Sequence, residues 1–179
     1  MEALVIRDTG KHGEALVNLL FRDTTDGVQV YASDRCIPPA IRAVSYASRK
    51  FGEKPFGQLS YGNVELGIGD DSLPYLKYHC GFFSVDGYKT MRPINEEEWR
   101  KSVLVRQNLR SSFRYLLKRR QQNLRGELYI AGFGQNVPNA IRVSHYFRHS
   151  YNAGVKDVEM GVITRNDGTV VAGIRVKMK

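Results

Sequence analysis

Two stretches of the chain, IPPAIRAVSY at residues 37–46 and VPNAIRVSHY at residues 137–146, share five residue types at a spacing of one hundred. The shared positions are Pro38/Pro138, Ala40/Ala140, Ile41/Ile141, Arg42/Arg142 and Tyr46/Tyr146. Proline near the start of a helix costs little, because the first N–H groups of a helix have no partner within it. Both stretches are therefore predicted to open a helix at the same place in a repeated unit.

The flanking sequence extends this similarity beyond ten residues. At the same spacing the aligned pairs are Leu4/Leu104, Val5/Val105, Leu16/Leu116, Val28/Leu128 and Val30/Ile130. Farther along, NVELGI at 63–68 matches DVEMGV at 157–162, after a six-residue length difference in one loop. Matches spread over a whole supersecondary unit indicate an internal duplication.

Each unit is predicted to have the element order βαβαββ. Short apolar runs predict strands at 3–6, 28–32, 61–68 and 75–85 in the first unit, and at 102–105, 127–131, 157–164 and 169–178 in the second. The turn signals Gly69-Asp70-Asp71-Ser72 and Arg165-Asn166-Asp167-Gly168 separate the last two strands of each unit. The interval 84–99, with its proline and acidic cluster, is the predicted connection between units.

Apolar stripes at helical spacing predict the two helices of each unit. For the first helix the stripes are Ala15, Leu16, Leu19 and Leu20, and Leu109, Phe113, Leu116 and Leu117. For the second helix they are Ile37, Ala40, Ile41, Val44, Ala47 and Phe51, and Val137, Ala140, Ile141, Ser144, Phe147 and Tyr151. The fold class is thus α/β, of the two-layer α+β type, with domains at residues 1–91 and 92–179.

Positive charge is concentrated in the second unit. The 179-residue chain has a formal net charge of +9. Residues 1–91 contain 10 Lys/Arg and 11 Asp/Glu, whereas residues 92–179 contain 17 Lys/Arg and 7 Asp/Glu. Such asymmetry favours a polyanionic partner, above all nucleic acid, although a basic surface can also serve solubility alone.

The densest basic segment is residues 100–125, where nine of 26 positions are Arg or Lys and none is acidic. Its candidate phosphate-binding residues are Arg106, Arg110, Arg114 and Lys118, which recur every four residues, and then Arg119, Arg120 and Arg125. A helix face that only meets solvent would be expected to carry Glu four residues before such cations. A polyanion that neutralises the row explains their absence, and binding would then depend strongly on salt.

Residues 132–141 match the pattern small-x-Gly-x-x-[Ile/Val]-x-x-Ala-[Ile/Val], and residues 32–41 match it with Asp34 in place of glycine. A βαβαββ unit that opens its second helix with this pattern resembles the Alba family of small nucleic-acid-binding proteins. The basic residue that the family often has just before the Ala-Ile pair is absent, since Pro39 and Asn139 stand there. The resemblance implies a pseudo-dimer of two Alba-like units within one chain, and binding of DNA or RNA, in some members within ribonuclease P-type particles.

The resemblance also implies contacts from the loop that enters the second helix and from the last hairpin. The residues concerned in the second unit are Gln135, Asn136, Asn139, Arg142 and Arg165. The pairs Arg42/Tyr46 and Arg142/Tyr146 have two readings. They are either an RNA-facing surface, since bases stack on Tyr and Arg planes, or a contact between the two units. The second reading is favoured, because the near-neutral first unit retains its pair.

Catalysis is not expected. His145 and His149 lie four residues apart, but no third metal ligand accompanies them, and the Gly132-Phe133-Gly134 stretch lacks the third glycine of a dinucleotide fingerprint. Cys36 and Cys80 have no ligand-like spacing and are predicted to be reduced, packed thiols. We therefore expect no enzyme, cofactor or metal.

The sequence thus predicts a non-catalytic nucleic-acid-binding protein that prefers RNA to DNA. The alternative is a scaffold subunit of a ribonucleoprotein particle, ribonuclease P-like or ribosomal, that acts mainly through other protein subunits. A homodimer of tandem chains is a further option. No apolar run reaches the roughly 18 residues of a membrane span. Glu2 and Asp8 near the N-terminus are unlike a secretory signal, so an intracellular location is expected, cytoplasmic or nuclear, with an organelle left open.

Overall fold

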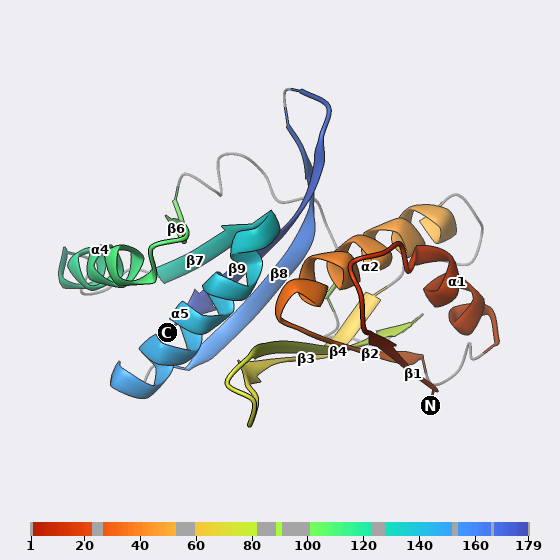
Figure 1. The fold of residues 1–179 in the computed structure, drawn as a ribbon, viewed down its shortest axis with the longest axis horizontal. Helices are drawn as coiled ribbons and strands as arrows, with labels where there is room; N and C mark the ends of the chain where they lie inside the picture. Colours follow the sequence, from red (N-terminus) through yellow and green to blue (C-terminus); the bar gives the residue numbers. More distant parts are fainter. Residues whose placement is uncertain are drawn as a thin grey trace.

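The protein is a mixed α/β structure built from two sheets and four α-helices in its described part (Figure 1). The computed structural model describes residues 2–22, 27–52, 60–81, 89–90, 101–122, 128–151, 154–165 and 167–178. Of the sequence predictions, Arg125, Asn166 and nearly all of the 84–99 connection lie outside these residues, as does the predicted domain boundary at 91/92.

The first unit forms one sheet with two helices. Its strands are β1 (Glu2–Ile6), β2 (Val28–Ser33), β3 (Ser60–Ile68), β4 (Pro74–Gly81) and the two-residue β5 (Lys89–Thr90), and its helices are α1 (Gly13–Arg22) and α2 (Ile37–Gly52). The strand order is β1-β2-β4-β3-β5, with β1 and β2 parallel and the other neighbours antiparallel.

The second unit repeats this arrangement. Its strands are β6 (Val103–Leu104), β7 (Leu128–Phe133), β8 (Val155–Thr164) and β9 (Val170–Met178), and its helices are α4 (Leu109–Gln122) and α5 (Val137–Tyr151). The order β6-β7-β9-β8 matches the order β1-β2-β4-β3 strand for strand, again with only the first pair parallel. The predicted βαβαββ order is confirmed in both units.

The strand registers show how closely the units correspond. Ala32 in β2 lies opposite Leu76 in β4, and Gly132 in β7 lies opposite Ile174 in β9. The opening strands differ by one residue from the ungapped alignment, because Leu4 pairs with Val30 whereas Val103, not Leu104, pairs with Ile130. The alignment of Leu4 and Val5 with Leu104 and Val105 is therefore wrong by one position. The alternation of burial along the strand fixes this register, because Val103 and Val105 are buried and Leu104 between them is exposed.

The second helix of each unit buries the stripe that the sequence predicts. All six predicted positions of α2 are at most 2% exposed, and so are the five described positions of α5, from Val137 to Phe147. Each fully buried Ile, Val or Phe among them stabilises the fold by about 1.5–3 kcal/mol relative to an exposed side chain. The α1 stripe differs from the prediction, because Ala15 is exposed and Val17 is buried instead, between Leu16 and Leu20.

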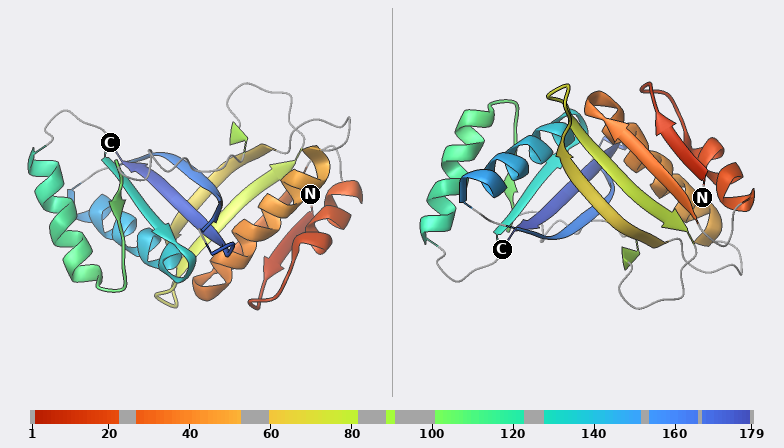
Figure 2. Two further views of the ribbon diagram at one scale, coloured as in Figure 1. Left: turned by 90° about the horizontal axis from the view of Figure 1, so that it is seen from above. Right: turned by 90° about the horizontal axis from the view of Figure 1, so that it is seen from below.

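The two units share one hydrophobic core. Helix α2 contacts β8 and β9 of the second unit, and α5 contacts β3 and β4 of the first. Most of the buried apolar side chains of the two sheets and the four described helices belong to a single continuous cluster. Figure 2 shows the resulting order of helices, α4, α5, α2 and α1, with the junction between the units at its centre. The central helices thus contribute to the core of both halves.

Both cysteines are free and buried, as predicted for packed thiols. Burial raises the pKa of the Cys80 thiol to about 12. In the part of the chain that the structure describes, no helix combines the length and apolarity needed to cross a membrane.

Candidate nucleic-acid interface

Helix α4 begins at Leu109 because Asn108 caps it. The Asn108 side-chain oxygen accepts a hydrogen bond from the Ser111 N–H at 3.0 Å. The Ser112 hydroxyl donates to the Asn108 carbonyl at 3.1 Å and accepts from the Arg106 N–H at 3.3 Å. A side-chain oxygen at this position satisfies one of the free N–H groups of the first turn. The cap fixes where the helical row of cations starts.

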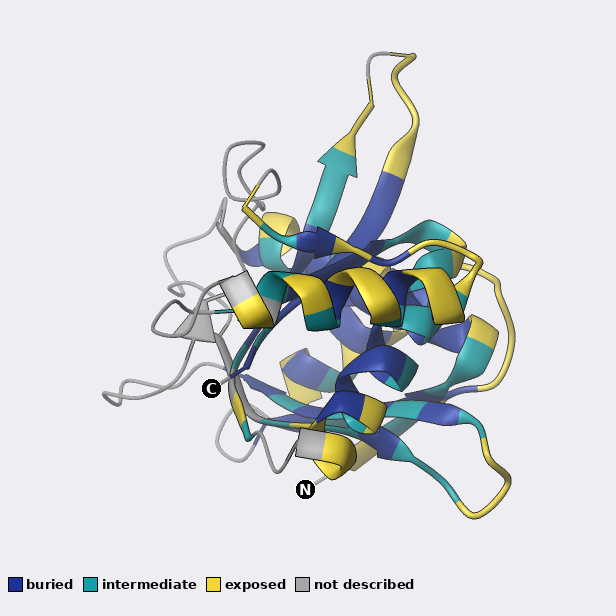
Figure 3. Cartoon of the chain, turned by 90° about the vertical axis from the view of Figure 1, so that its left-hand side faces the viewer, coloured by how far each residue is buried: buried dark blue, intermediate teal, exposed yellow. Residues whose placement is uncertain are grey.

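Arg106, Arg110, Arg114 and Lys118 are all exposed, and we call them the α4 row. Figure 3 faces the side of the molecule that α4 covers and shows exposed residues along the outer face of this helix. The inner face packs Leu116, fully buried, and the half-buried Phe113 and Leu117 against the core. Arg119 is half-buried, and the side chain of Arg120 lies outside the described residues. The row forms no ion pair with any carboxylate of the described residues.

The first unit lacks the part of this row that lies on the helix. At the positions equivalent to Arg110, Arg114 and Lys118, one hundred residues earlier, α1 and its approach carry Gly10, Glu14 and Asn18. The alignment of these helices rests on Leu16 and Leu116, both fully buried at the same place in the repeat. The charge asymmetry of the sequence is therefore an asymmetry between two equivalent surfaces at opposite ends of the helix layer (Figure 2).

A cleft of about 340 Å³, which we call the axial cleft, lies where the two units meet at the start of α2 and α5. Its lining residues are Thr9, Asp34, Arg35, Pro38, Pro39, Arg42, Gly134, Gln135, Pro138 and Arg142. Eight of them form equivalent pairs one hundred residues apart, which places the cleft on the pseudo-two-fold axis of the repeat. Three arginines, Arg35, Arg42 and Arg142, face a single carboxylate there, that of Asp34, and the first turns of α2 and α5 line the cleft with proline rings.

The turn before each of these helices has a left-handed backbone. Asp34 has φ +47° and Gly134 has φ +52°, so the aspartate of the first unit adopts the conformation for which the second unit has glycine. Aspartate is one of the few residues that accept this conformation at small cost. At Gly132 a Cβ atom would lie 2.5 Å from the Asn136 carbonyl oxygen. Both glycines of the 132–134 stretch are thus explained by backbone geometry.

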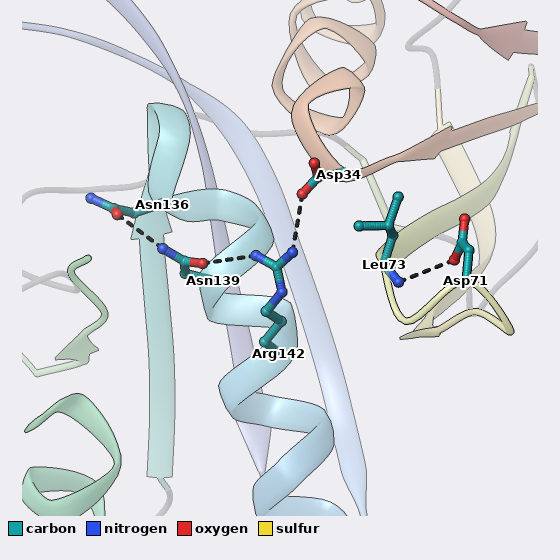
Figure 4. A network of polar contacts seen from close by, with 6 residues as sticks. All are labelled: Asp34, Asp71, Leu73, Asn136, Asn139 and Arg142. Atoms are coloured by element: carbon teal, nitrogen blue, oxygen red, sulfur yellow. Dashed lines mark hydrogen bonds and ion pairs between the residues drawn. The ribbon is translucent and has the colours of Figure 1, made fainter. Parts of the chain in front are cut away.

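Arg142 joins the two units through a chain of polar contacts (Figure 4). Its guanidinium donates to the Asp34 carboxylate of the first unit at 3.2 Å and to the Asn139 side-chain oxygen at 3.0 Å. The Asn139 amide in turn donates to the Asn136 side-chain oxygen at 3.4 Å. Asn136 and Asn139, predicted to contact nucleic acid, therefore orient Arg142, whereas Gln135 is exposed in the cleft.

The tyrosines of the two Arg/Tyr pairs lie against helices of their own units. The Tyr46 hydroxyl donates a hydrogen bond to the Glu14 carboxylate of α1, which is the largest cause of the lowered pKa of Glu14. Tyr146 packs edge-on against Phe113 of α4, with ring centroids 4.7 Å apart. Of the residues for which a contact between the units was favoured, Arg142 makes such a contact, whereas these contacts of Tyr46 and Tyr146 lie within a single unit. Arg42 is exposed and lines the axial cleft.

The last hairpins of the two units share one turn geometry but differ in length and charge. In each, the first N–H of the turn donates to the carbonyl four residues on, from Gly69 to Leu73 at 2.9 Å and from Arg165 to Thr169 at 2.8 Å. The β8–β9 arm continues by two residue pairs, Ile163/Val171 and Thr164/Val170, beyond the last equivalent pair of β3–β4. It projects from the body of the molecule (Figure 1) and exposes Arg165 at its tip.

The structure thus brings some predicted residues together and separates others. The α4 row and the axial cleft are connected, because a groove between α4 and α5 is lined by Arg110 on one side and by Arg142 on the other. Arg165 lines neither the groove nor the axial cleft, since it follows Thr164/Val170, the last residue pair of the arm. Arg35 was missed by sequence reasoning. The only sign of it in the sequence is its place in the repeat, because Arg35 follows the duplicated turn at the position equivalent to Gln135.

A scan of protein-family models found none that matches the chain, and a search of curated proteins found no match either.

Proposed function

We propose that the protein binds nucleic acid without catalysing a reaction, that it prefers RNA to DNA, and that the phosphate backbone lies along the α4 row and the axial cleft. The observation that carries this proposal is the continuity of cationic surface from Arg110 through Arg142 to the cleft. Arginine is suited to this task, because its guanidinium forms bidentate contacts with phosphate and stacks on bases.

The asymmetry of the repeat supports the proposal. The first unit has the same fold but carries no cations at the positions equivalent to Arg110, Arg114 and Lys118, so the fold does not require these three. The short first arm has Asp70 and Asp71 at its turn, whereas the longer second arm has Arg165. One unit therefore supplies the binding surface and the other completes the core and one wall of the cleft.

The proposal includes kinship with the Alba family. The matching pattern at residues 132–141, the βαβαββ order of each unit and the pairing of two units around a pseudo-two-fold axis support it. In this proposal the chain corresponds to a dimer of such units joined into one polypeptide, with one of its two equivalent helix surfaces specialised for phosphate.

A titration of single-stranded RNA and duplex DNA across a salt series tests the proposed function. With about five phosphate contacts on a single strand, the slope of log affinity against log salt is expected near −3.5, and RNA is expected to bind more tightly than duplex DNA. Affinity that does not change with salt would exclude a phosphate-driven mechanism. Tighter binding of duplex DNA would overturn the preference for RNA.

Asp34 is expected to weaken nucleic-acid binding, because its carboxylate occupies Arg142 in the axial cleft. The substitution Asp34→Gly copies the second unit, suits the left-handed backbone and frees the guanidinium. We expect the affinity for RNA to rise about fivefold, which corresponds to about 1 kcal/mol for one partly exposed charge. Asp70→Asn, which removes one charge from the distant first hairpin, is the matched control and is expected to change affinity by less than about twofold. Equal effects of both substitutions would contradict a specific role of the cleft.

The second candidate function is a scaffold subunit of a ribonucleoprotein particle. The observation in its favour is the exposure of Val5 and Phe21 on the near-neutral first unit, at the opposite end from the α4 row. This candidate predicts weak RNA affinity for the isolated protein and tight binding to a partner protein through the first unit. The salt titration therefore separates the two functions, because only the first predicts RNA binding by the chain alone.

A further inference from the structure

We propose that the groove between α4 and α5 holds an unstacked base of a single-stranded RNA, which stacks on the ring of Tyr146 beside Phe113. This inference rests on the proposed function and names the form of nucleic acid that the interface takes. The groove has a volume of about 280 Å³ and is lined by Leu109, Arg110, Phe113, Arg142, Val143 and Tyr146. Its inner surface is apolar and aromatic, and guanidinium groups stand on both of its sides.

The first unit has the same two helices, but with smaller side chains at the positions that line the groove in the second unit. The positions equivalent to Leu109, Arg110 and Phe113 are Thr9, Gly10 and Gly13. Helix α1 begins only at Gly13, whereas α4 begins four positions earlier in the repeat. Larger side chains on an additional helical turn therefore hold α4 away from α5, and α1 packs more closely on α2 than α4 does on α5.

The tyrosines show the same difference. In the first unit the ring of Tyr46 covers Gly13 so closely that a Cβ atom there would lie 2.4 Å from it, and its hydroxyl is held by Glu14. In the second unit Phe113 occupies the place of Gly13, and Arg114 replaces the carboxylate. Tyr146 consequently stands edge-on to Phe113 and is 59% exposed. The tyrosine at this position of the repeat therefore packs on α1 in the first unit and is exposed to solvent in the second.

The chemistry of the groove fits a nucleotide. A volume of about 280 Å³ is near the lower end, about 300 Å³, of pockets that hold small molecules, which suits one base with its sugar. Bases stack on Tyr and Phe rings, and the flanking phosphates would meet Arg110 and Arg142. Both arginines belong to the proposed phosphate track, so the backbone would already pass the mouth of the groove. A duplex keeps its bases stacked, and single-stranded RNA is therefore the form that this groove selects.

The test compares two oligomers of about ten nucleotides that carry equal charge. One is a single-stranded RNA, and the other is the same ribose-phosphate chain without bases. The wild-type protein is expected to bind the intact RNA about tenfold more tightly, the effect of one well-stacked base. In Tyr146→Ala this preference should fall to about twofold or less, while Tyr146→Phe, which keeps the ring, should retain it. Tyr46→Ala removes the equivalent ring of the first unit and should leave the preference unchanged.

Each outcome bears on the inference. Equal affinity of the wild type for both oligomers would overturn it and leave the phosphate-driven function intact. A preference for bases that survives in Tyr146→Ala, or that is lost equally in Tyr46→Ala, would also overturn it. If neither oligomer binds, the inference and the proposed function both fail. Because Tyr146 is exposed, its substitution is expected to leave the fold unchanged, which circular dichroism checks in every variant.

Discussion

Reversal of three cations of the α4 row, by Arg110→Glu, Arg114→Glu and Lys118→Glu, is expected to abolish measurable RNA binding. Each substitution removes a phosphate contact and replaces it by repulsion, so we expect a loss of at least about 100-fold near physiological salt. The salt dependence should become shallower by about 2 in the log–log slope, as about 0.7 is lost per contact to a single strand. Fluorescence anisotropy with labelled RNA measures both quantities.

The matched control reverses three exposed cations of the first unit, Arg22, Arg49 and Lys50, and thus changes the net charge equally. These side chains lie at the C-terminal ends of α1 and α2, whereas the axial cleft lies at the N-terminal end of α2. The control is expected to lower affinity by less than about fivefold, through the general field of the molecule. Equal losses in the two triple variants would mean that net charge alone, and not the α4 row, governs binding. All six side chains are exposed, and Lys50 pairs with Glu14 at 3.6 Å, so the control variant is expected to be only slightly less stable to heat than the α4 variant.

Phe147→Ala is expected to destabilise the whole protein and not only the second unit. Phe147 is fully buried on α5, which contacts strands of both sheets. Loss of a buried aromatic ring costs about 3–5 kcal/mol in free energy of unfolding, through lost transfer energy and the cavity left behind. Because the units share one core, we expect a single cooperative transition at lower denaturant concentration. Urea unfolding followed by circular dichroism gives the free energy.

Hydrogen exchange measured by mass spectrometry shows whether the destabilisation is shared. In Phe147→Ala, exchange should accelerate by the same factor in β2 and β4 of the first unit as in β7 and β9 of the second. Tyr146→Ala, one residue earlier in α5 at a largely exposed position, is the control and should cost less than about 1 kcal/mol. Faster exchange confined to the second unit would show that the halves are independent domains.

The element order could be predicted from the sequence because the duplication supplied two readings of one pattern. The predicted stripes of α2 and α5 consist almost entirely of apolar residues, so only one face of each helix could be buried, and that face is buried in the structure. The short opening strands were predicted less well. Over two or three residues a one-position shift costs few matches, and only the alternation of buried Val103 and Val105 around exposed Leu104 fixes the register. Likewise, Ala15 fits a helical stripe by its type, but the larger Val17 takes the buried place.

The candidate site was predictable only in part. The α4 row follows from a four-residue spacing, which is a local property of a helix. The axial cleft and the groove depend on how two helices from distant parts of the chain are spaced, and no local pattern contains this information. Arg35 and the partners of Tyr46 and Tyr146 belong to this class. The sequence did contain one signal for the groove, the replacement of Gly13 and Glu14 in the first unit by Phe113 and Arg114 in the second. This replacement changes the side chains that contact the tyrosine of the second helix.

A map of the positions at which bound RNA crosslinks to the full-length protein tests the central claim most directly. Ultraviolet crosslinking of thiouridine-containing single-stranded RNA, followed by mass spectrometry of the peptides, gives this map. The proposed interface predicts crosslinks in α4, at the start of α5 and around Arg35 at the axial cleft, and none along α1. Crosslinks concentrated on α1 and the acidic hairpin of the first unit, or spread evenly over both units, would contradict it.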